Sequence, residues 1–178
     1  DAVTKRFYDR FKKEHENFKK AIEGITESAD LDWYASVTLN RLMFCYFIQK
    51  KGFLNSDTDY LQNKLQLFIE REDETGFYSF YLKFLMVLFH DGLGGRERNI
   101  ESEELLGKIP YLNGGMFEVH ELEQKYDSIR INNAAFLDVF NFFDQYKWHL
   151  DINPDAPGNE INPDVLGYIF EKYINQRA

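Results

Sequence analysis

One segment, Leu42–Ile48, constrains the fold more than any other part of the chain, because every residue in it is apolar or aromatic. It lies within a longer pattern at helical spacing, which starts at Asp30 or Asp32 as the N-cap and stops at Lys50–Gly52. A helix that is apolar nearly all round must be covered on every side. The sequence therefore predicts a helical protein built around this segment, with Cys45 buried as a small hydrophobic residue rather than acting as a nucleophile.

Apolar residues recur at helical spacing in further stretches, which turn-forming segments separate. The expected helices are 3–24, 57–72 with Ser56 or Asp57 as the cap, 75–90, about 133–146 after Asn132 or Asn133, and a last helix that begins at Pro163 after Asn162.

The stretch between these helices loses its periodicity. Asp91–Gly95 is typical of a turn, Glu121–Tyr126 of a helical turn, and Phe117–His120 and Ser128–Ile131 of two short strands. We therefore expect a mainly α fold, a multi-helix bundle with a Gly-rich irregular insert that has room for a small two-stranded β element. The expected organisation is one compact domain with helices in 1–90, the insert in 91–131 and C-terminal helices in 132–178.

Composition excludes several classes of protein. With 178 residues, of which 44% are hydrophobic, the chain can form a sizeable core and is not disordered. Its single cysteine excludes a disulfide scaffold and favours a reducing, cytoplasmic setting. No apolar run approaches the roughly 18 residues that a membrane span needs, so we expect no membrane partner. Because the chain begins with Asp1 rather than Met, we expect it to be a piece of a longer protein.

Charge is distributed unevenly along the chain. Residues 1–51 contain 10 Lys or Arg against 8 Asp or Glu, whereas residues 101–178 contain 6 against 14. A surface that binds DNA phosphates needs clustered cations, so the C-terminal half is a poor candidate. The basic cluster of the first helix has two interpretations, the solvated face of an amphipathic helix or a contact with the DNA backbone; the candidate contacts are Lys5, Lys12, Lys13 and Lys19.

The sequence contains no motif that is typical of a catalytic or metal-binding site. The four histidines stand singly, without metal-ligand spacing, and the glycine clusters lack the phosphate-loop signature. Pro163-Asp164 followed by Glu171-Lys172 mimics a metal-nuclease motif, but the adjacent acid and lysine cannot share a metal from a strand, where they point to opposite faces. We therefore expect no catalytic residue, no metal site and no cofactor site in this chain.

Four segments, in this order, resemble the helical region of type IIG restriction–modification enzymes, which fuse a nuclease to an adenine-N6 methyltransferase in one chain. The segments are Val3–Tyr8 with Phe11-Lys12, Asn40–Leu54, Ile109–Glu118 and Asn162–Tyr173. The third is similar to the family's "iPYLNGGLFE" signature, and the fourth to its "LG-x-I-x-E" helix. The resemblance extends over essentially the whole chain.

The resemblance implies where the chemistry of such a parent protein would lie. In the family, the last helix leads into the methyltransferase, whose S-adenosylmethionine-binding segment and catalytic NPPY tetrapeptide follow, and the nuclease precedes. The resemblance therefore implies a non-catalytic connector that positions both domains on DNA. The parent would use S-adenosylmethionine and Mg²⁺, and it would act as a DNA adenine-N6 methyltransferase or a type II restriction endonuclease.

We expect the signature segments to dock the connector onto its neighbouring domains; the alternative is that the glycine-bearing loop merely turns the chain. Glycines allow a positive φ or a close backbone approach. The docking candidates are Pro110, Tyr111, Leu112, Asn113, Gly114, Gly115, Leu166, Gly167 and Glu171. A stand-alone helical module that binds another protein is the alternative for the chain as a whole.

Overall fold

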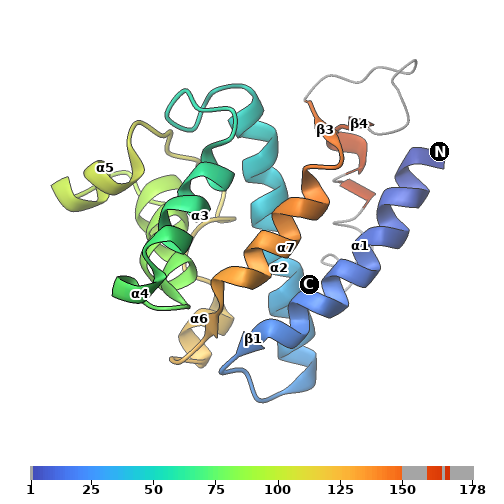
Figure 1. Ribbon diagram of the computed structural model, residues 1–178, viewed down its shortest axis with the longest axis horizontal. Helices are drawn as coiled ribbons and strands as arrows, with labels where there is room; N and C mark the ends of the chain where they lie inside the picture. Colours follow the sequence, from blue (N-terminus) through green and yellow to red (C-terminus); the bar gives the residue numbers. More distant parts are fainter. Residues whose placement is uncertain (1, 150–159, 166, 169–178) are drawn as a thin grey trace.

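The central helix, α2 (Ser28–Lys50), is buried along most of its length, as its all-round apolar sequence requires. A computed structural model describes residues 2–149, 160–165, 167 and 168, and these are mainly helical (Figure 1). The N-cap of α2 is Glu27, so the prediction of Asp30 or Asp32 was wrong. Asp30 lies in the first turn instead, where a carboxylate interacts favourably with the helix dipole. At the other end the helix stops where predicted, and Gly52 takes a positive φ of 78°, which is common just after a helix.

Two helices cover α2 on one side, α1 (Ala2–Ala21) and α7 (Asn133–Phe143). Figure 1 shows α7 running between α1 and α3. Aromatic rings join them, since Phe7 of α1 stacks on Phe142 of α7 at 5.2 Å between ring centroids. Asn132 caps α7 as predicted, because its side chain accepts a hydrogen bond from the Ala135 amide.

Four helical segments form the other side of the described molecule. They are α3 (Tyr60–Glu70), the short α4 (Glu72–Thr75) and two π-helical segments, η1 (Phe80–Leu85) and η2 (Val87–Leu93). A helix was predicted over 75–90, but η2 continues to Leu93. Gly92 does not form the predicted turn: it is buried, and a Cβ there would lie 2.6 Å from the Ile109 side chain, so the glycine serves close packing.

Short helices complete the irregular stretch. α5 (Ile100–Leu106) was not predicted, and the Asn99 side chain caps it by accepting from the Ser102 amide. α6 (Glu121–Lys125) agrees with the predicted helical turn. The helix predicted to begin at Pro163 is present over its described residues, and Asn162 caps it by accepting from the Asp164 amide.

Two pairs of very short strands tie distant segments together. β1 (Ile22–Glu23) pairs antiparallel with β2 (Arg130–Ile131), and β3 (Lys147–Trp148) pairs parallel with β4 (Glu160–Ile161). The strand predicted over Ser128–Ile131 is thus confirmed in part. The strand predicted over Phe117–His120 was wrong, because the Glu118 carbonyl accepts a hydrogen bond from the side chain of Arg41 rather than from a neighbouring strand.

The core contains the one cysteine of the chain. Cys45 is fully buried in α2, and burial raises the pKa of its thiol, in agreement with the predicted structural role. None of the described helices combines the length and apolar character that crossing a membrane would require.

Gly24 and Gly76 have nearly equal φ but different surroundings. Substituting each of them tests how closely the chain after β1 approaches the chain before β2. Gly24 (φ 94°) follows β1, and a Cβ there would overlap the Ser128 carbonyl; Gly76 (φ 97°) follows α4 and has open space. Gly76→Ala should cost about 1–3 kcal/mol of unfolding free energy, from backbone strain alone, because its φ of 97° and ψ of 163° are nearly exclusive to glycine. Gly24→Ala should cost at least about 1 kcal/mol more, because the chain must also move. Urea denaturation measures both, and equal losses would contradict the close approach.

Candidate functional site

The Gly-rich loop, Pro110–Glu118, is the most irregular of the predicted segments, and the fold holds it at both ends. On the entry side, the Leu112 amide donates to the Leu93 carbonyl at 2.8 Å, and Arg98 donates to the carbonyls of Ile109 and Gly92, both at 2.9 Å. These bonds attach the start of the loop to the end of η2.

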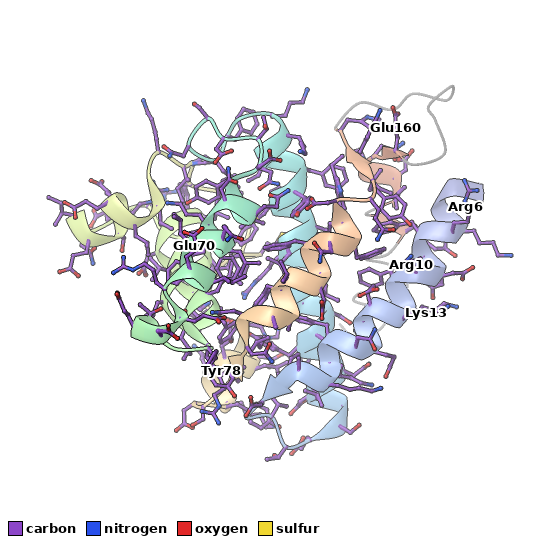
Figure 2. The ribbon with its side chains drawn as sticks, viewed as in Figure 1. Arg6, Arg10, Lys13, Glu70, Tyr78 and Glu160 are labelled. Atoms are coloured by element: carbon purple, nitrogen blue, oxygen red, sulfur yellow. The ribbon has the colours of Figure 1, made fainter. Side chains whose placement is uncertain are left out.

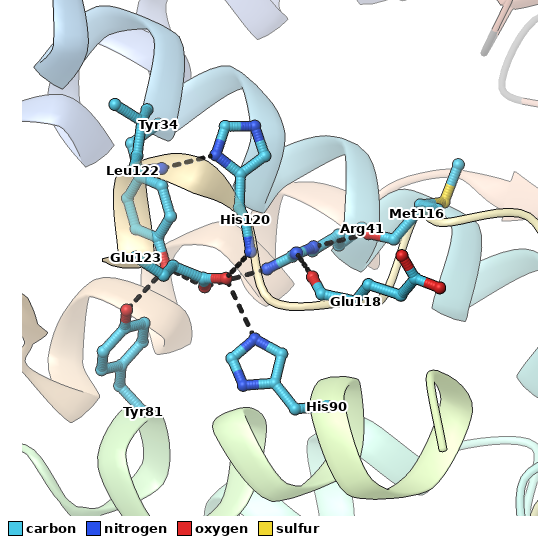
Figure 3. Close-up of polar contacts among 9 residues, drawn as sticks. All are labelled: Tyr34, Arg41, Tyr81, His90, Met116, Glu118, His120, Leu122 and Glu123. Carbon is cyan, nitrogen blue, oxygen red and sulfur yellow. Dashed lines mark hydrogen bonds and ion pairs between the residues drawn. The ribbon is translucent and has the colours of Figure 1, made fainter. Parts of the chain in front are cut away.

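On the exit side, a single buried arginine holds the main chain of the loop. Arg41, in the middle of α2, donates from Nε to the Met116 carbonyl at 2.9 Å and from Nη2 to the Glu118 carbonyl at 2.7 Å. Its side chain is 1% exposed, and its guanidinium lies over the Phe89 ring at 5.2 Å from the centroid. The segment Asn40–Leu54 therefore fixes the shape of the loop directly (Figure 3).

The charge of Arg41 is balanced by a carboxylate that sequence reasoning missed. Glu123 of α6 accepts from Arg41 Nη1 at 3.0 Å and from the Tyr34 hydroxyl at 2.7 Å on one oxygen. Its other oxygen accepts from His90 at 3.0 Å and from the His120 amide at 2.8 Å (Figure 3). Each carboxylate oxygen thus has two donors, so its lone pairs are occupied.

Electrostatics keep this carboxylate ionised. Burial by itself would raise the pKa of Glu123, but the hydrogen bond from His90, the positive charge of Arg41 and the hydrogen bonds from Tyr34 and the His120 amide hold that pKa well below its usual range. Tyr34 in turn accepts from the Tyr81 hydroxyl at 2.6 Å, and burial raises the pKa of Tyr34 well above its usual value.

The arrangement braces the structure and leaves Glu123 without a free lone pair for chemistry. A carboxylate with four donors cannot take up a proton from a substrate or bind a metal without losing a partner. The network instead joins α2, η1, η2, α6 and the loop at one point. The signal that could have revealed it is Arg41 itself, because a buried guanidinium on an apolar helix requires a carboxylate or several carbonyls near it.

Three of the predicted docking residues, Asn113, Gly114 and Gly115, form an exposed tip on the Gly-rich loop. Pro110, Tyr111 and Leu112 are half-buried, and the Arg96 guanidinium lies over the Tyr111 ring at 5.2 Å. Gly114 and Gly115 are exposed, with φ of 134° and 86°, and Asn113 beside them is exposed too. A Cβ on Gly114 would meet nothing within 4 Å, so there the backbone conformation, rather than internal packing, calls for glycine.

Of the docking candidates in the C-terminal helix, Gly167 is exposed, whereas Leu166 and Glu171 lie outside the described residues.

The candidate DNA contacts lie along α1, where Figure 2 shows Arg6, Arg10 and Lys13 following one another. Lys5 and Lys13 are exposed and make no ion pair with the described part of the chain. Lys12 lies 3.5 Å from the Asp9 carboxylate and above the Tyr8 ring. Lys19 is half-buried, and its ammonium lies 3.1 Å from Glu16 and 3.7 Å from Asp32.

His15, Glu16 and Asp32 could in principle bind a metal ion, because each places a ring nitrogen or carboxylate oxygen within 4.8 Å of the others. The spacing in the sequence did not reveal this group, because two helices supply its members. The Lys19 ammonium contacts both carboxylates, so a protein cation already balances their charge. His15 Nε2 is hydrogen-bonded to the Ser36 hydroxyl at 2.8 Å, which is the environment of a buried structural histidine.

Comparison with known proteins identifies a distant relative. The chain is 31% identical over 154 residues to a protein of Methanocaldococcus jannaschii that bears the provisional name of a type II restriction enzyme and methyltransferase. The matched region covers 84% of this chain but 13% of that protein, so the chain spans a small part of its relative's length. No family model and no solved structure matches the chain. The chain is thus a distant relative of one segment of a restriction–modification protein.

The buried carboxylate predicts how stability depends on pH. Because the pKa of Glu123 is lower in the folded than in the unfolded protein, its contribution is fully present above its unfolded value of about 4.5 and is lost as the pH falls toward the folded value. At neutral pH, Glu123→Gln should cost about 3–5 kcal/mol, because it leaves the Arg41 charge uncompensated. Thermal unfolding from pH 7 to pH 3 should show a flatter pH dependence for this variant.

Glu121→Gln provides the matched control, since Glu121 is an exposed residue of the same short helix. Its stability and pH profile should follow those of the wild-type chain. An equally large loss in both variants, or a wild-type profile that stays flat below pH 4.5, would show that the network does not stabilise the fold.

Proposed function

We propose that this chain is a non-catalytic helical connector of a type IIG restriction–modification enzyme. In this proposal, it positions a nuclease and an S-adenosylmethionine-dependent adenine methyltransferase of the same parent protein on DNA. The similarity over 84% of the chain to a much longer protein, named for restriction and methylation, supports this interpretation. The chemistry, with S-adenosylmethionine and Mg²⁺, would belong to other parts of the parent.

The observation that carries the proposal is the way in which Arg41 holds the Gly-rich loop in place. Arg41, from one signature segment, holds the carbonyls of Met116 and Glu118 in another, while Asn113–Gly115 remain exposed. A loop that only turned the chain would need no buried ion pair beneath it, and desolvating such a pair is costly. A rigid base under an exposed tip is the arrangement that lowers the entropic cost of docking. In the proposal, the tip contacts the methyltransferase.

Blocking the tip without disturbing the base tests the docking role. In the full-length parent, Asn113→Trp should lower DNA methylation and DNA cleavage per folded molecule by about tenfold, because the bulky ring would separate the docked surfaces. Asn141→Trp, at an exposed position on α7, is the matched control and should leave both activities unchanged. The docking role would be wrong if the Asn113→Trp enzyme, with wild-type thermal stability, kept full activity.

The second part of the proposal, a contact between α1 and the DNA backbone, rests on Lys5 and Lys13, because Lys19 is occupied by two carboxylates. Replacing Lys5 and Lys13 with Gln in the parent should reduce the slope of log K against log salt concentration by about 0.9 for each phosphate that the protein no longer neutralises. Lys19→Gln should not change the slope. Filter binding over a range of salt concentrations measures it, and an unaltered slope in the Lys5/Lys13 variant would refute the contact.

A further inference from the structure

Asn113 and Gly114, at the exposed tip of the Gly-rich loop, form the only Asn-Gly pair in the sequence. Two such residues can react with each other, because the main-chain nitrogen of the second comes within reach of the side-chain amide carbon of the first. A side chain on the second residue hinders this approach, and glycine has none. Whether the pair reacts therefore depends on its exposure, its hydrogen bonds and the space around it.

Both residues meet these three conditions. Asn113 and Gly114 are exposed, so water reaches them. Within the described part of the chain, neither the Asn113 side chain nor the Gly114 main-chain amide makes a hydrogen bond that would hold the two groups apart. A Cβ on Gly114 would meet nothing within 4 Å, so a ring that joins the two residues does not collide with the rest of the described structure.

The loop is fixed immediately before and immediately after this tip. The Leu112 amide donates to the Leu93 carbonyl at 2.8 Å, and Arg41 donates to the Met116 carbonyl at 2.9 Å. Only Asn113–Gly115 lie between these two attachments, and both glycines take positive φ. A chemical change at the tip is therefore confined to these residues, because the hydrogen bonds on either side hold the rest of the loop.

We infer that Asn113 is a site of spontaneous deamidation. The Gly114 nitrogen gives its proton to water and attacks Cγ of Asn113. A carbon–nitrogen bond forms there, the bond from Cγ to the side-chain nitrogen breaks, and ammonia leaves with the proton. Water then opens the resulting succinimide ring at one of its two carbonyl carbons. Opening at the former side-chain carbon gives aspartate, and opening at the main-chain carbon gives isoaspartate, whose main chain runs through Cβ; no group is oxidised or reduced.

The products differ from asparagine in charge and in length. Each adds one negative charge to the tip, and isoaspartate also adds a carbon to the main chain between Leu112 and Met116. Because both of these residues are held, the added length is taken up within the tip. The surface of the loop therefore changes with the age of the protein, whereas the fold beneath it does not. This inference does not depend on the connector proposal, since it concerns the chemistry of this chain alone.

Two other sites in the chain provide internal comparisons. Asp91-Gly92 could form the same ring by losing water, but Gly92 is buried within η2, and a Cβ there would lie 2.6 Å from the Ile109 side chain. Asn141 is exposed, but the buried Phe142 follows it within α7, where helical hydrogen bonds hold the main chain. The fold therefore opposes the reaction at both positions and leaves it open at the tip.

Ageing the folded 178-residue chain in heavy-oxygen water at mildly alkaline pH tests the inference. By peptide mass spectrometry, the Asn113 peptide should lose ammonia and gain heavy oxygen, while the Asn141 and Asp91 peptides stay unchanged. An isoaspartate-specific carboxyl methyltransferase with a labelled methyl donor should then label the aged chain. Gly114→Ala should slow the reaction about tenfold, because a Cβ hinders the attack. Gly115→Ala, which alters the same tip but not the attacking residue, should react at the wild-type rate.

Unfolding measurements separate a change at the tip from damage to the fold. The thermal unfolding curves of the aged and the fresh chain should coincide, because the hydrogen bonds of Leu112 and Met116 are kept. The inference is overturned if the Asn113 peptide reacts in urea but not in the folded chain, or if Asn141 reacts as fast as Asn113. It is overturned equally if Gly114→Ala reacts at the wild-type rate.

Discussion

The ion pair between Arg41 and Glu123 sets the conditions under which the rest of the structure forms. Removing two charges from water costs several kcal/mol per ion, and their attraction offsets this only when every remaining donor and acceptor is satisfied. The other partners of the pair, namely two loop carbonyls, Tyr34, His90 and the His120 amide, are therefore requirements rather than additions. Helices α2, η2 and α6 must all be in place before the pair is stable. The Gly-rich loop acquires its shape as a result.

Much of the helical framework could be predicted from the sequence, because it depends on local patterns. The apolar stretch Leu42–Ile48, the Asn132 cap and the Asn162–Pro163 start each act within a few residues, and the structure agrees with them. The predicted strand over Phe117–His120 failed because a residue from another helix, Arg41, takes a carbonyl that a neighbouring strand would have used. No local pattern reports such a competition.

The candidate site was predictable in its exposed part and not in its buried part. Glycines at 114 and 115 indicate an unusual backbone from the sequence alone, and both take positive φ. Glu123 gives no such signal, since it is one of several acidic residues in a polar stretch, and its side-chain partners are 33 to 89 residues away along the chain. Long-range pairing of this kind follows from the tertiary fold. Lys19 shows the same limit, since it belongs to a basic run in sequence but is neutralised by Glu16 and Asp32 in space.

The π-helical segments decide where this part of the chain can change its length. Tyr81 in η1 and His90 in η2 reach the same network, Tyr81 through Tyr34 and His90 directly. A π-helical turn holds about one residue more than an α-helical turn. Losing that residue can therefore restore α-helical winding and leave the residues on either side facing the same way. In α2, which is α-helical throughout, the same deletion would turn every later residue by about 100° around the axis.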